Sequence, residues 1–421
     1  MVDVVRAGLA RSDRVFWLDG GGARDWSGSR SLVGVLAPDD VSLTYDAAAG
    51  RVVRHRSGRA EVVGSDVFEV LEQEVARDEG DPAVHWVGFW GYAARPGQAA
   101  RPWGMGPDAV WMRSRDVRFF HHEVTPPPAG SVSRGAVGEV PPAYDLAFAR
   151  VQEHLRAGNS YEVNLTYREQ LGVPGPGDPL ATYLRLRASN PAPYAGLLTH
   201  RGTHLLSSSP ERYALVDAGR QLVAKPIKGT TPRGATPEDD EALRRHLTSD
   251  PKLRAENLMI TDLLRNDLSM VCEVGSVEVP SLMAVESYPS VHQLVTTVTG
   301  RLRDDVSTIA ALRALFPAGS MTGAPKRRTM EIVEEVEGTP RGPYSGAFGW
   351  VCADGRADLG VVIRSLYAAP GQPWSLGTGG GITVRSDVAE EWAETRWKAE
   401  RLRRAAGEGL DEGLDGGIGE P

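Results

Sequence analysis

Lys228 is the residue whose sequence context most suggests chemistry, because it stands in a short segment, residues 224–234, that proline and glycine constrain. Two prolines bracket Gly229, so the pattern predicts a fixed loop and excludes a helix. The segment follows an apolar run at 213–223 that is typical of a strand. Its glycines and Thr230 leave backbone N–H groups free to bind an anion.

A lysine in such a loop is either a solvated surface charge or a nucleophile, and the loop alone does not decide between the two. An unperturbed lysine has a pKa of ~10.4, so only about one molecule in 2,500 carries the free amine at pH 7. A nucleophilic Lys228 therefore needs desolvation or a nearby cation to lower its pKa. Lys225 and Arg233 in the same segment are the candidates for that cation.

Three glutamates occupy the starts of two predicted helices. Asp250 followed by proline predicts a helix N-terminus, with Glu256 in the first turns. A second helix is predicted to begin at 386 or 387, and it carries Glu391 and Glu394 on one face. Each glutamate alone is explained as a favourable charge near a helix N-terminus. Together they make a hard oxygen site of the kind that Mg²⁺ prefers.

A strand is predicted at 161–167, where apolar and polar residues alternate. Glu162, Asn164 and Thr166 share its polar face. That face is either in solvent or the wall of an active site, and the pattern alone favours solvent.

The composition is that of an ordinary globular protein of 421 residues, with 41% apolar and 24% charged residues. A net charge of −8 without a basic block argues against nucleic acid as a partner. Cys272 and Cys352 match no metal-binding spacing, so we expect reduced thiols and a cytoplasmic protein. Neither an apolar run of membrane-spanning length nor a signal-peptide core is evident, so no membrane partner is expected.

Four regions are predicted along the chain. Residues 1–122 are expected to form a β-rich N-terminal subdomain, and the five prolines and three glycines of 123–142 predict a linker or long loop. The catalytic region is expected at 143–405 and should begin with a helix at 145–158 that has an acidic cap. Residues 406–421 are rich in glycine and acidic residues and predict a disordered tail.

The sequence Pro-Ile-Lys-Gly-Thr around Lys228 resembles the signature loop of component I of the aminodeoxychorismate synthases, within the family of chorismate-utilising enzymes. Anthranilate synthases of the same family usually carry alanine at this lysine. Water-using members carry a lysine where this chain has Glu162, which argues against isochorismate or salicylate synthesis. The other matching motifs, in the family's order, are Ser-Pro-Glu at 209–211, Ala-Glu-Asn at 255–257, Tyr-Pro-Ser-Val-His at 288–292, the decapeptide at 317–326, Tyr-Ser-Gly-Ala at 344–347, Val-Ile-Arg-Ser at 362–365 and Gly-Gly-Gly-Ile at 379–382.

The resemblance implies an α+β fold, the chorismate-binding fold, in which two large antiparallel sheets pack together and are flanked by helices. It implies amination of chorismate at C4 by ammonia to 4-amino-4-deoxychorismate, en route to 4-aminobenzoate, with Mg²⁺ as cofactor. The 4-aminobenzoate would serve either folate biosynthesis or a specialised pathway. Lys228 would be the nucleophile and Glu211 the general acid. The implied substrate-binding residues are His292, Ser320, Tyr344, Arg364, Gly380, Gly381 and Thr230, and the implied Mg²⁺ ligands are Glu256, Glu391 and Glu394.

Glu211 has a simpler explanation in the sequence, as a surface carboxylate paired with the neighbouring Arg212. The general-acid role requires burial that raises its pKa toward neutrality. Neither cysteine lies in a glutaminase elbow, so the resemblance implies that ammonia comes from a separate glutamine amidotransferase subunit or from solution. Two rivals remain: anthranilate synthase component I, against which Lys228 argues, and a chorismate-binding protein without catalysis.

Overall fold

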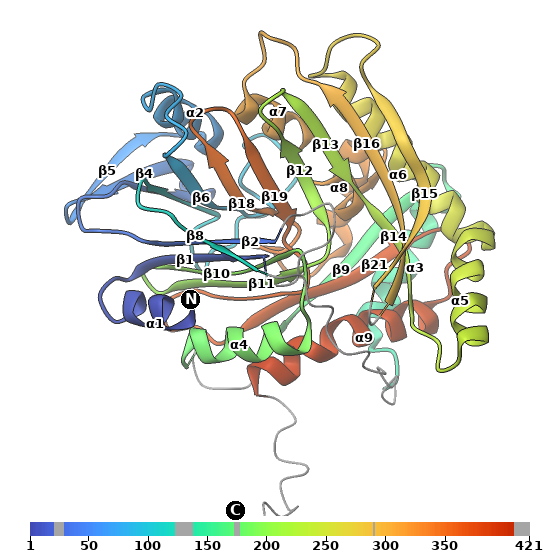
Figure 1. Cartoon of the computed structure of the whole chain (residues 1–421). Helices are drawn as coiled ribbons and strands as arrows, with labels where there is room; N and C mark the ends of the chain where they lie inside the picture. Colours follow the sequence, from blue (N-terminus) through green and yellow to red (C-terminus); the bar gives the residue numbers. More distant parts are fainter. Residues whose placement is uncertain (21–28, 123–137, 172–176, 289–290, 408–421) are drawn as a thin grey trace, which may run out of the picture.

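A computed structural model describes residues 1–20, 29–122, 138–171, 177–288 and 291–407, and their strands form two large antiparallel sheets (Figure 1). Within these residues, the first sheet has nine strands. Their order is β17 (Gly323–Ala324), β9 (Glu162–Gln170), β21 (Ser375–Ile382), β20 (Ser365–Ala368), β11 (Thr203–Ser209), β10 (Tyr194–His200), β1 (Arg14–Asp19), β2 (Arg30–Val35) and β8 (Arg118–His121). The predicted α+β chorismate-binding architecture of two antiparallel sheets is confirmed.

The second sheet has twelve strands among the described residues. Its order is β14 (Ile227–Pro232), β16 (Val291–Arg301), β13 (Gln221–Lys225), β12 (Arg212–Val216), β19 (Ala357–Val361), β18 (Ala347–Cys352), β6 (His85–Trp90), β7 (Ala109–Ser114), β3 (Ser42–Asp46), β4 (Arg51–Arg56) and β5 (Arg59–Gly64), and β15 (Glu278–Ser287) pairs with β16. Strands before residue 123 thus stand beside later ones in both sheets: β1 pairs with β10, and β6 pairs with β18.

Strand β1 shows why the two sheets pack into layers. All six of its residues are buried, and neighbouring side chains in a strand point to opposite faces. Val15 and Trp17 pack in a cluster with residues of the helices that cover the first sheet. Phe16 and Leu18 join a second cluster that includes Phe348 of β18 in the other sheet. The sheet is therefore covered by helices on one face and by the second sheet on the other.

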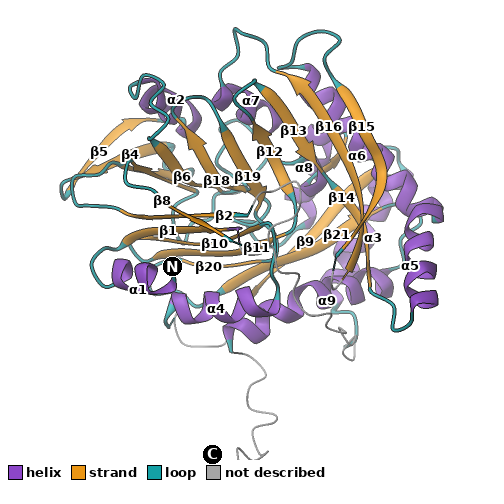
Figure 2. Ribbon diagram, viewed as in Figure 1, coloured by secondary structure: helices purple, strands orange, loops and turns teal. Residues whose placement is uncertain are grey.

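Helices flank the two sheets, as Figure 2 shows. α1 (Val2–Leu9), α4 (Pro179–Ser189) and α9 (Val388–Ala406) contribute to the outer cluster of the first sheet. α5 (Pro237–Ser249) and α6 (Pro251–Ser269) lie near β14, β15 and β16 in Figure 1. The remaining helical elements are α2 (Val67–Ala76), α3 (Pro142–Arg156), α7 (Thr308–Leu315), α8 (Lys326–Val336) and the short 3₁₀ helix η2 (Gly319–Met321). None of the described helices has the length and apolar character needed to cross a membrane.

The two predicted helix starts that carry glutamates are confirmed. The Asp250 carboxylate accepts hydrogen bonds from two backbone N–H groups in the first turn of α6, at 2.8 and 3.0 Å. Asp387 does the same for α9, at 2.9 and 3.1 Å. The acidic cap predicted for the helix at 145–158 is wrong, because α3 begins at Pro142, so Asp145 falls inside the first turn.

The division of the chain into a separate N-terminal subdomain stays a prediction. Most of the predicted linker, residues 123–137, lies outside the described residues, as do residues 408–421 of the predicted tail. Helix α9 ends at Ala406, with Gly407 in the left-handed conformation (φ 103°) that commonly terminates a helix.

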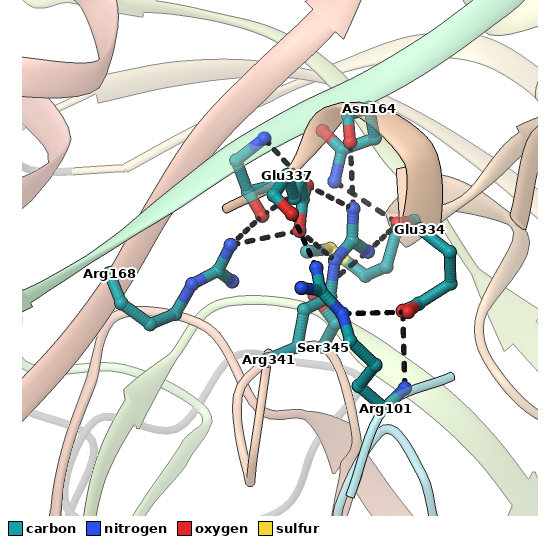
Figure 3. A network of polar contacts seen from close by, with 9 residues as sticks. Arg101, Asn164, Arg168, Glu334, Glu337, Arg341 and Ser345 are labelled. Carbon is teal, nitrogen blue, oxygen red and sulfur yellow. Dashed lines mark hydrogen bonds and ion pairs between the residues drawn. The ribbon is translucent and has the colours of Figure 1, made fainter. Parts of the chain in front are cut away.

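A buried network of charged side chains joins β9 to the segments around α8 and η2 (Figure 3). The Glu337 carboxylate accepts hydrogen bonds from Arg341 at 2.7 and 3.0 Å and from Arg168 at 2.9 Å. Arg341 also donates to the carbonyl oxygens of Met321 at 2.6 Å and Asn164 at 2.8 Å. The Arg341 and Glu337 side chains are only 1% and 2% exposed. The network therefore fixes β9 against the end of η2.

Replacing Arg341 with methionine should lower the free energy of unfolding by about 3–5 kcal/mol, because it leaves the buried Glu337 carboxylate without its main partner. Urea denaturation followed by tryptophan fluorescence measures this loss. Arg327→Met is the matched control, since the Arg327 side chain is 97% exposed, and its cost should stay within about 0.5 kcal/mol. Equal losses in the two variants would contradict a stabilising role of the network.

Candidate active site

Lys228 lies on strand β14, so the loop predicted at 224–234 is wrong. β14 pairs with β16 at the edge of the second sheet, and the register shifts between Ile227 and Thr230. This shift is a β-bulge, a feature that often redirects a side chain next to an active site. Gly229 has φ 93°, a conformation that glycine adopts without strain. The proline and glycine signals therefore shape a bulged edge strand that presents Lys228.

The apolar run at 213–223 is a hairpin of two strands, β12 and β13, and the single predicted strand is wrong. The Arg220 N–H donates to the Asp217 carbonyl at 3.0 Å to close the turn, with Arg220 at φ 62°. Aspartate and glycine between apolar residues are a turn signal that the prediction missed. The hairpin pairs Arg212 with Lys225, and so brings Glu211 to the end of the chain segment that leads to Lys228.

A cavity of about 990 Å³ lies between β9 and β21, β14 and the helices α6 and α9. Its size is near the upper end for small-molecule sites. All but one of the predicted site residues line it: Lys228, Thr230, Glu211, Glu256, Ser320, Tyr344, Arg364, Gly380, Gly381, Glu391 and Glu394. Residues that are widely separated in sequence therefore meet at one site.

Lys228 is surrounded by carboxylates. Its ammonium forms a short ion pair with Glu162 of β9, and its side chain is 11% exposed. Burial lowers the pKa of Lys228, but Glu162, Glu256 and Glu211 raise it, and the net direction is upward. Before a ligand enters, Lys228 is therefore an ammonium group and not a free amine.

The cations expected to activate Lys228 are engaged elsewhere. Lys225 forms an ion pair with Glu286 at 2.5 Å, and Arg233 pairs with Asp240 at 2.6 Å. The expected lowering of the lysine pKa by these two residues is therefore wrong. A free amine at this position requires a proton acceptor.

Glu211 has the environment that a general acid needs. The residue is 6% exposed, and the Ser320 hydroxyl donates to its carboxylate at 2.6 Å. Burial raises the pKa of Glu211 to about 7, against the lowering effects of the Ser320 hydrogen bond and two lysine ammonium groups. Its sequence neighbour Arg212 lies 3.6 Å from Asp358 instead, so the explanation of Glu211 as a surface carboxylate paired with Arg212 is wrong.

The three predicted Mg²⁺ ligands face the same cavity without forming a closed metal cage. Among the described residues, no three acidic, histidine or cysteine side chains are close enough together to hold an ion. Lysines partner two of the glutamates: Lys252 contacts Glu391 at 2.8 Å, and Lys398 contacts Glu394 at 2.7 Å. The Lys398 ammonium holds the pKa of Glu394 below its usual value.

Glu256 is the glutamate whose state best fits a cation. Its Oε1 atom is buried without a hydrogen-bond partner. Burial raises the pKa of Glu256 to about 7, which shows that its negative charge is poorly compensated. An unpaired carboxylate oxygen in a cavity that two further glutamates line suits the hard Mg²⁺ ion, provided that the two lysines release their glutamates and the three carboxylates move closer together.

Arg364 lines the cavity with a guanidinium that takes part in none of the ion pairs formed by the described residues. It lies over the Trp397 ring, 5.4 Å from the ring centroid. Burial, with a smaller effect of Arg401, lowers the pKa of Arg364 to about 10. An unpaired arginine at a cavity wall is suited to bidentate binding of a carboxylate.

The glycines of β21 allow side chains to pack directly against this strand. A Cβ atom at Gly377 would lie 2.2 Å from the Tyr344 ring, and one at Gly380 would lie 3.1 Å from the Glu391 carboxylate. Within the described residues, strand β20 pairs with β21 only at residues 375 and 376, so no strand covers the rest of that edge. Lys398 donates a hydrogen bond to the Gly379 carbonyl at 3.0 Å.

His292 is the predicted site residue that does not line the cavity. It is 1% exposed, and its ring nitrogens contact Asp240 at 2.9 Å and Ser287 at 2.8 Å. The next residue of β16, Gln293, lines the cavity instead. Alternate residues of a strand face opposite sides, so Gln293 and not His292 faces the cavity. Residues 289–290 of that motif lie outside the described residues.

Of the two possibilities for the polar face of 161–167, the structure excludes solvent, which the pattern alone favoured, and shows a buried wall. Glu162, Asn164 and Thr166 are 1%, 5% and 3% exposed. Their alternation with apolar residues correctly predicted the strand. The polarity of the side chains alone cannot distinguish a solvent-exposed face from a buried polar wall of a cavity.

Lys252 and Lys398 are site residues that the sequence did not reveal. Lys398 follows Glu394 by four residues, a spacing that favours an ion pair on a helix. Lys252 carries no such signal, because its partner lies 139 residues away in the chain.

A model of the chorismate binding enzyme family matches residues 131–404, which is more than half of the chain. The chain belongs to this family. The matched segment contains every residue that lines the cavity, so the family's shared part and the candidate site coincide.

Named relatives include aminodeoxychorismate synthases and anthranilate synthases. The aminodeoxychorismate synthase of Streptomyces griseus is 38% identical over 442 residues, covering 93% of this chain and 61% of the relative. Aminodeoxychorismate synthase component 1 of Escherichia coli is 41% identical over 259 residues, covering 62% of this chain and 56% of the relative. An anthranilate synthase component 1 of Haloarcula marismortui is also similar. The chain spans less than two thirds of the length of each of these relatives.

The fold is also similar to solved structures. The crystal structure of anthranilate synthase component I from Streptococcus pneumoniae matches with a TM-score of 0.72 at 24% identity, covering 90% of this chain and 93% of that one. The similarity establishes the fold of this chain.

Proposed function

We propose that this protein aminates chorismate at C4 with ammonia to give 4-amino-4-deoxychorismate. The observation that carries the proposal is the meeting of Lys228 and Glu211 in one cavity, with the pKa of Glu211 raised to about 7 by burial. A nucleophile and a general acid are the two groups that a covalent substitution needs. The names of the S. griseus and E. coli relatives support chorismate as the substrate.

The reaction follows from these two groups. The Lys228 amine attacks C2 of chorismate, both ring double bonds shift, and the C4–O bond breaks as Glu211 donates a proton to form water. Ammonia then attacks C4, both double bonds shift back, and the C2–N bond breaks with its electron pair returning to Lys228. The new ammonium group at C4 returns a proton to Glu211. The covalent step divides one difficult substitution into two easier ones.

The remaining cavity residues bind and orient the substrate in this proposal. Arg364 and Tyr344, with backbone groups of Gly380 and Gly381, hold the carboxylate of the enolpyruvyl side chain. Thr230 lies on the opposite wall with Lys228, and Ser320 orients the Glu211 carboxyl through its hydrogen bond.

Mg²⁺ belongs to the proposal as the ion held by Glu256, Glu391 and Glu394. When bound, it supplies positive charge that neutralises the ring carboxylate of the substrate. The support is the unpaired Oε1 atom of Glu256 and the shared cavity of the three glutamates.

Glu256→Gln should weaken Mg²⁺ binding by about 10-fold or more, because it removes the ligand whose charge is least compensated. Titration calorimetry with Mg²⁺ and chorismate measures this affinity independently of turnover. Glu390→Gln is the matched control, since Glu390 lines the same cavity but is not assigned to the ion. Equal Mg²⁺ affinities of both variants and the wild-type protein would remove Glu256 from the ligand set.

Ammonia is proposed to come from a separate glutamine amidotransferase subunit. The "component 1" in the name of the E. coli relative supports such a partner. A cytoplasmic location is part of the proposal and accords with two buried, free cysteines.

Mass spectrometry of the products after incubation with chorismate, Mg²⁺ and a high ammonium concentration tests the function. We expect 4-amino-4-deoxychorismate, which an added lyase converts to 4-aminobenzoate. Anthranilate with pyruvate would assign the protein to the rival branch. Unchanged chorismate that nevertheless binds in calorimetry would support the binding protein without catalysis.

A further inference from the structure

We propose that Glu162 is the proton acceptor that frees the Lys228 amine for its attack. This inference rests on the proposed function, because it assigns a further residue to the same reaction. The Glu162 carboxylate takes one proton from the Lys228 ammonium, and the resulting neutral amine forms the bond to C2. When that bond breaks, the departing amine takes the proton back from the Glu162 carboxyl, so protons and charge balance over one cycle.

The geometry selects Glu162 among the carboxylates near Lys228. Among the described residues, Glu162 is the one acidic side chain within ion-pair distance of the Lys228 ammonium. Glu211 is occupied by its hydrogen bond from Ser320. Glu162 is also almost fully buried, with a side chain 1% exposed. A proton can therefore pass between the two groups without entering bulk water.

The second carboxylate oxygen of Glu162 gives an independent reason. Oε2 is buried and has no hydrogen-bond partner. Oε1 faces the Lys228 ammonium, so Oε2 is an acceptor position that no hydrogen-bond donor occupies. Glu162 therefore has an oxygen free to hold a proton while the other remains beside Lys228.

The other charged groups explain why Lys228 needs a partner for its proton. Besides Glu162 on β9, negative charges act on it from Glu256 on α6, Glu211 before β12 and Glu394 on α9. The nearby cations are Lys252 on α6 and Lys398 on α9, and both are paired with glutamates of α9. The carboxylates hold Lys228 in its charged form, so the amine does not arise by ordinary dissociation at neutral pH.

Gly381 is the residue that leaves room for this pair. A Cβ atom at that position would lie 2.2 Å from Oε1 of Glu162 and 3.1 Å from Nζ of Lys228. The first contact is closer than real Cβ atoms make and the second is tight, so a side chain at 381 would displace the two charged groups from each other. Gly381→Ala should therefore reproduce the kinetic defect of a Glu162 variant while both charged residues remain in the chain.

The test measures the rate at which the lysine adduct forms in the wild-type protein and in Glu162→Gln, by rapid quench and intact-protein mass spectrometry between pH 6 and 9. We expect the variant to be slower by about 100-fold or more at pH 6, as for loss of a general base. In the variant the proton must leave to solvent, so the ratio of wild-type to variant rates should fall by about tenfold per pH unit. Because Glu211 is present in both proteins, its titration cancels in the ratio.

Glu162→Ala provides a second, independent variant, in which added formate can occupy the vacated space. We expect formate to restore part of the adduct-forming rate, with a dependence on formate concentration. Glu153→Gln is the matched control, since Glu153 lies on the exposed face of α3 and should behave as the wild-type protein.

The outcomes separate this inference from the proposed function. Suppose that the wild-type protein makes 4-amino-4-deoxychorismate, but that the ratio of wild-type to Glu162→Gln rates is constant across pH and formate does not rescue Glu162→Ala. This result would overturn Glu162 as proton acceptor and leave the proposed function intact. A wild-type protein that makes no 4-amino-4-deoxychorismate would overturn the function itself, whatever the variants do.

Discussion

Replacing Lys228 with alanine should abolish the covalent adduct and reduce the formation of 4-amino-4-deoxychorismate by about 1,000-fold or more. Loss of an attacking nucleophile has costs of this order or larger in other enzymes, because the divided reaction path disappears with it. Intact-protein mass spectrometry after mixing with chorismate detects the adduct as the mass of chorismate minus one water. Product formation is measured in the same samples.

Lys228→Arg separates the nucleophile from the positive charge. Arginine keeps a cation beside Glu162 but stays protonated at every pH of interest, so it cannot attack carbon. We expect this variant to bind chorismate and to form no adduct. Full turnover in Lys228→Arg would mean that the position contributes charge alone, and the covalent mechanism would then be wrong.

The motifs of the sequence predicted the composition of the site better than its local structure. Lys228 and Glu211 line one cavity, although the local pattern placed Lys228 in a loop and allowed Glu211 to be a surface charge. The loop prediction failed because two prolines and a glycine are compatible with a bulged edge strand as well as with a loop. Bulges depend on pairing with a distant strand, which local sequence does not encode.

The sequence could not predict which charged side chains of the site form ion pairs with each other. Glu162 meets Lys228 across 66 residues of chain, and Lys252 meets Glu391 across 139. Neither separation has a periodicity that a single sequence reveals. The expectation that cations near Lys228 in sequence would lower its pKa failed for the same reason, because sequence proximity does not fix where a long side chain points.

His292 illustrates a second limit. The motif located its segment of the chain but not the face of the strand that the segment forms, and a one-residue difference in a strand exchanges the two faces. The fold places Gln293 at the cavity and gives His292 a buried contact with Asp240. A motif therefore locates an element more securely than it locates the side chain that contacts a ligand.

Replacing Glu211 with glutamine should lower kcat/KM for chorismate by about 10²–10⁴-fold, the usual contribution of a general acid. Glutamine keeps the size of the side chain and can still accept the Ser320 hydrogen bond, so the cavity should keep its shape. The pH dependence gives the sharper result. A general acid acts in its protonated form, so the wild-type rate should fall as pH rises through about 7, where burial places the pKa of Glu211.

The fall in rate above about pH 7, the alkaline limb of the pH profile, should disappear in Glu211→Gln, because the variant has no proton to lose at this position. The profile must be recorded at saturating Mg²⁺, since burial also raises the pKa of Glu256 to about 7 and a bound cation would hold that group ionised. A limb that persists unchanged in Glu211→Gln would assign the titration to another group.

Ser320→Ala decides whether the limb belongs to Glu211. The Ser320 hydroxyl donates to the Glu211 carboxylate at 2.6 Å and lowers the pKa of Glu211 by stabilising its charged form. Removing the hydroxyl should raise that pKa and move the alkaline limb to higher pH, while the rate at low pH changes little. A structural defect would lower the rate at every pH without moving the limb. An upward shift in Ser320→Ala together with loss of the limb in Glu211→Gln would therefore identify Glu211 as the acid.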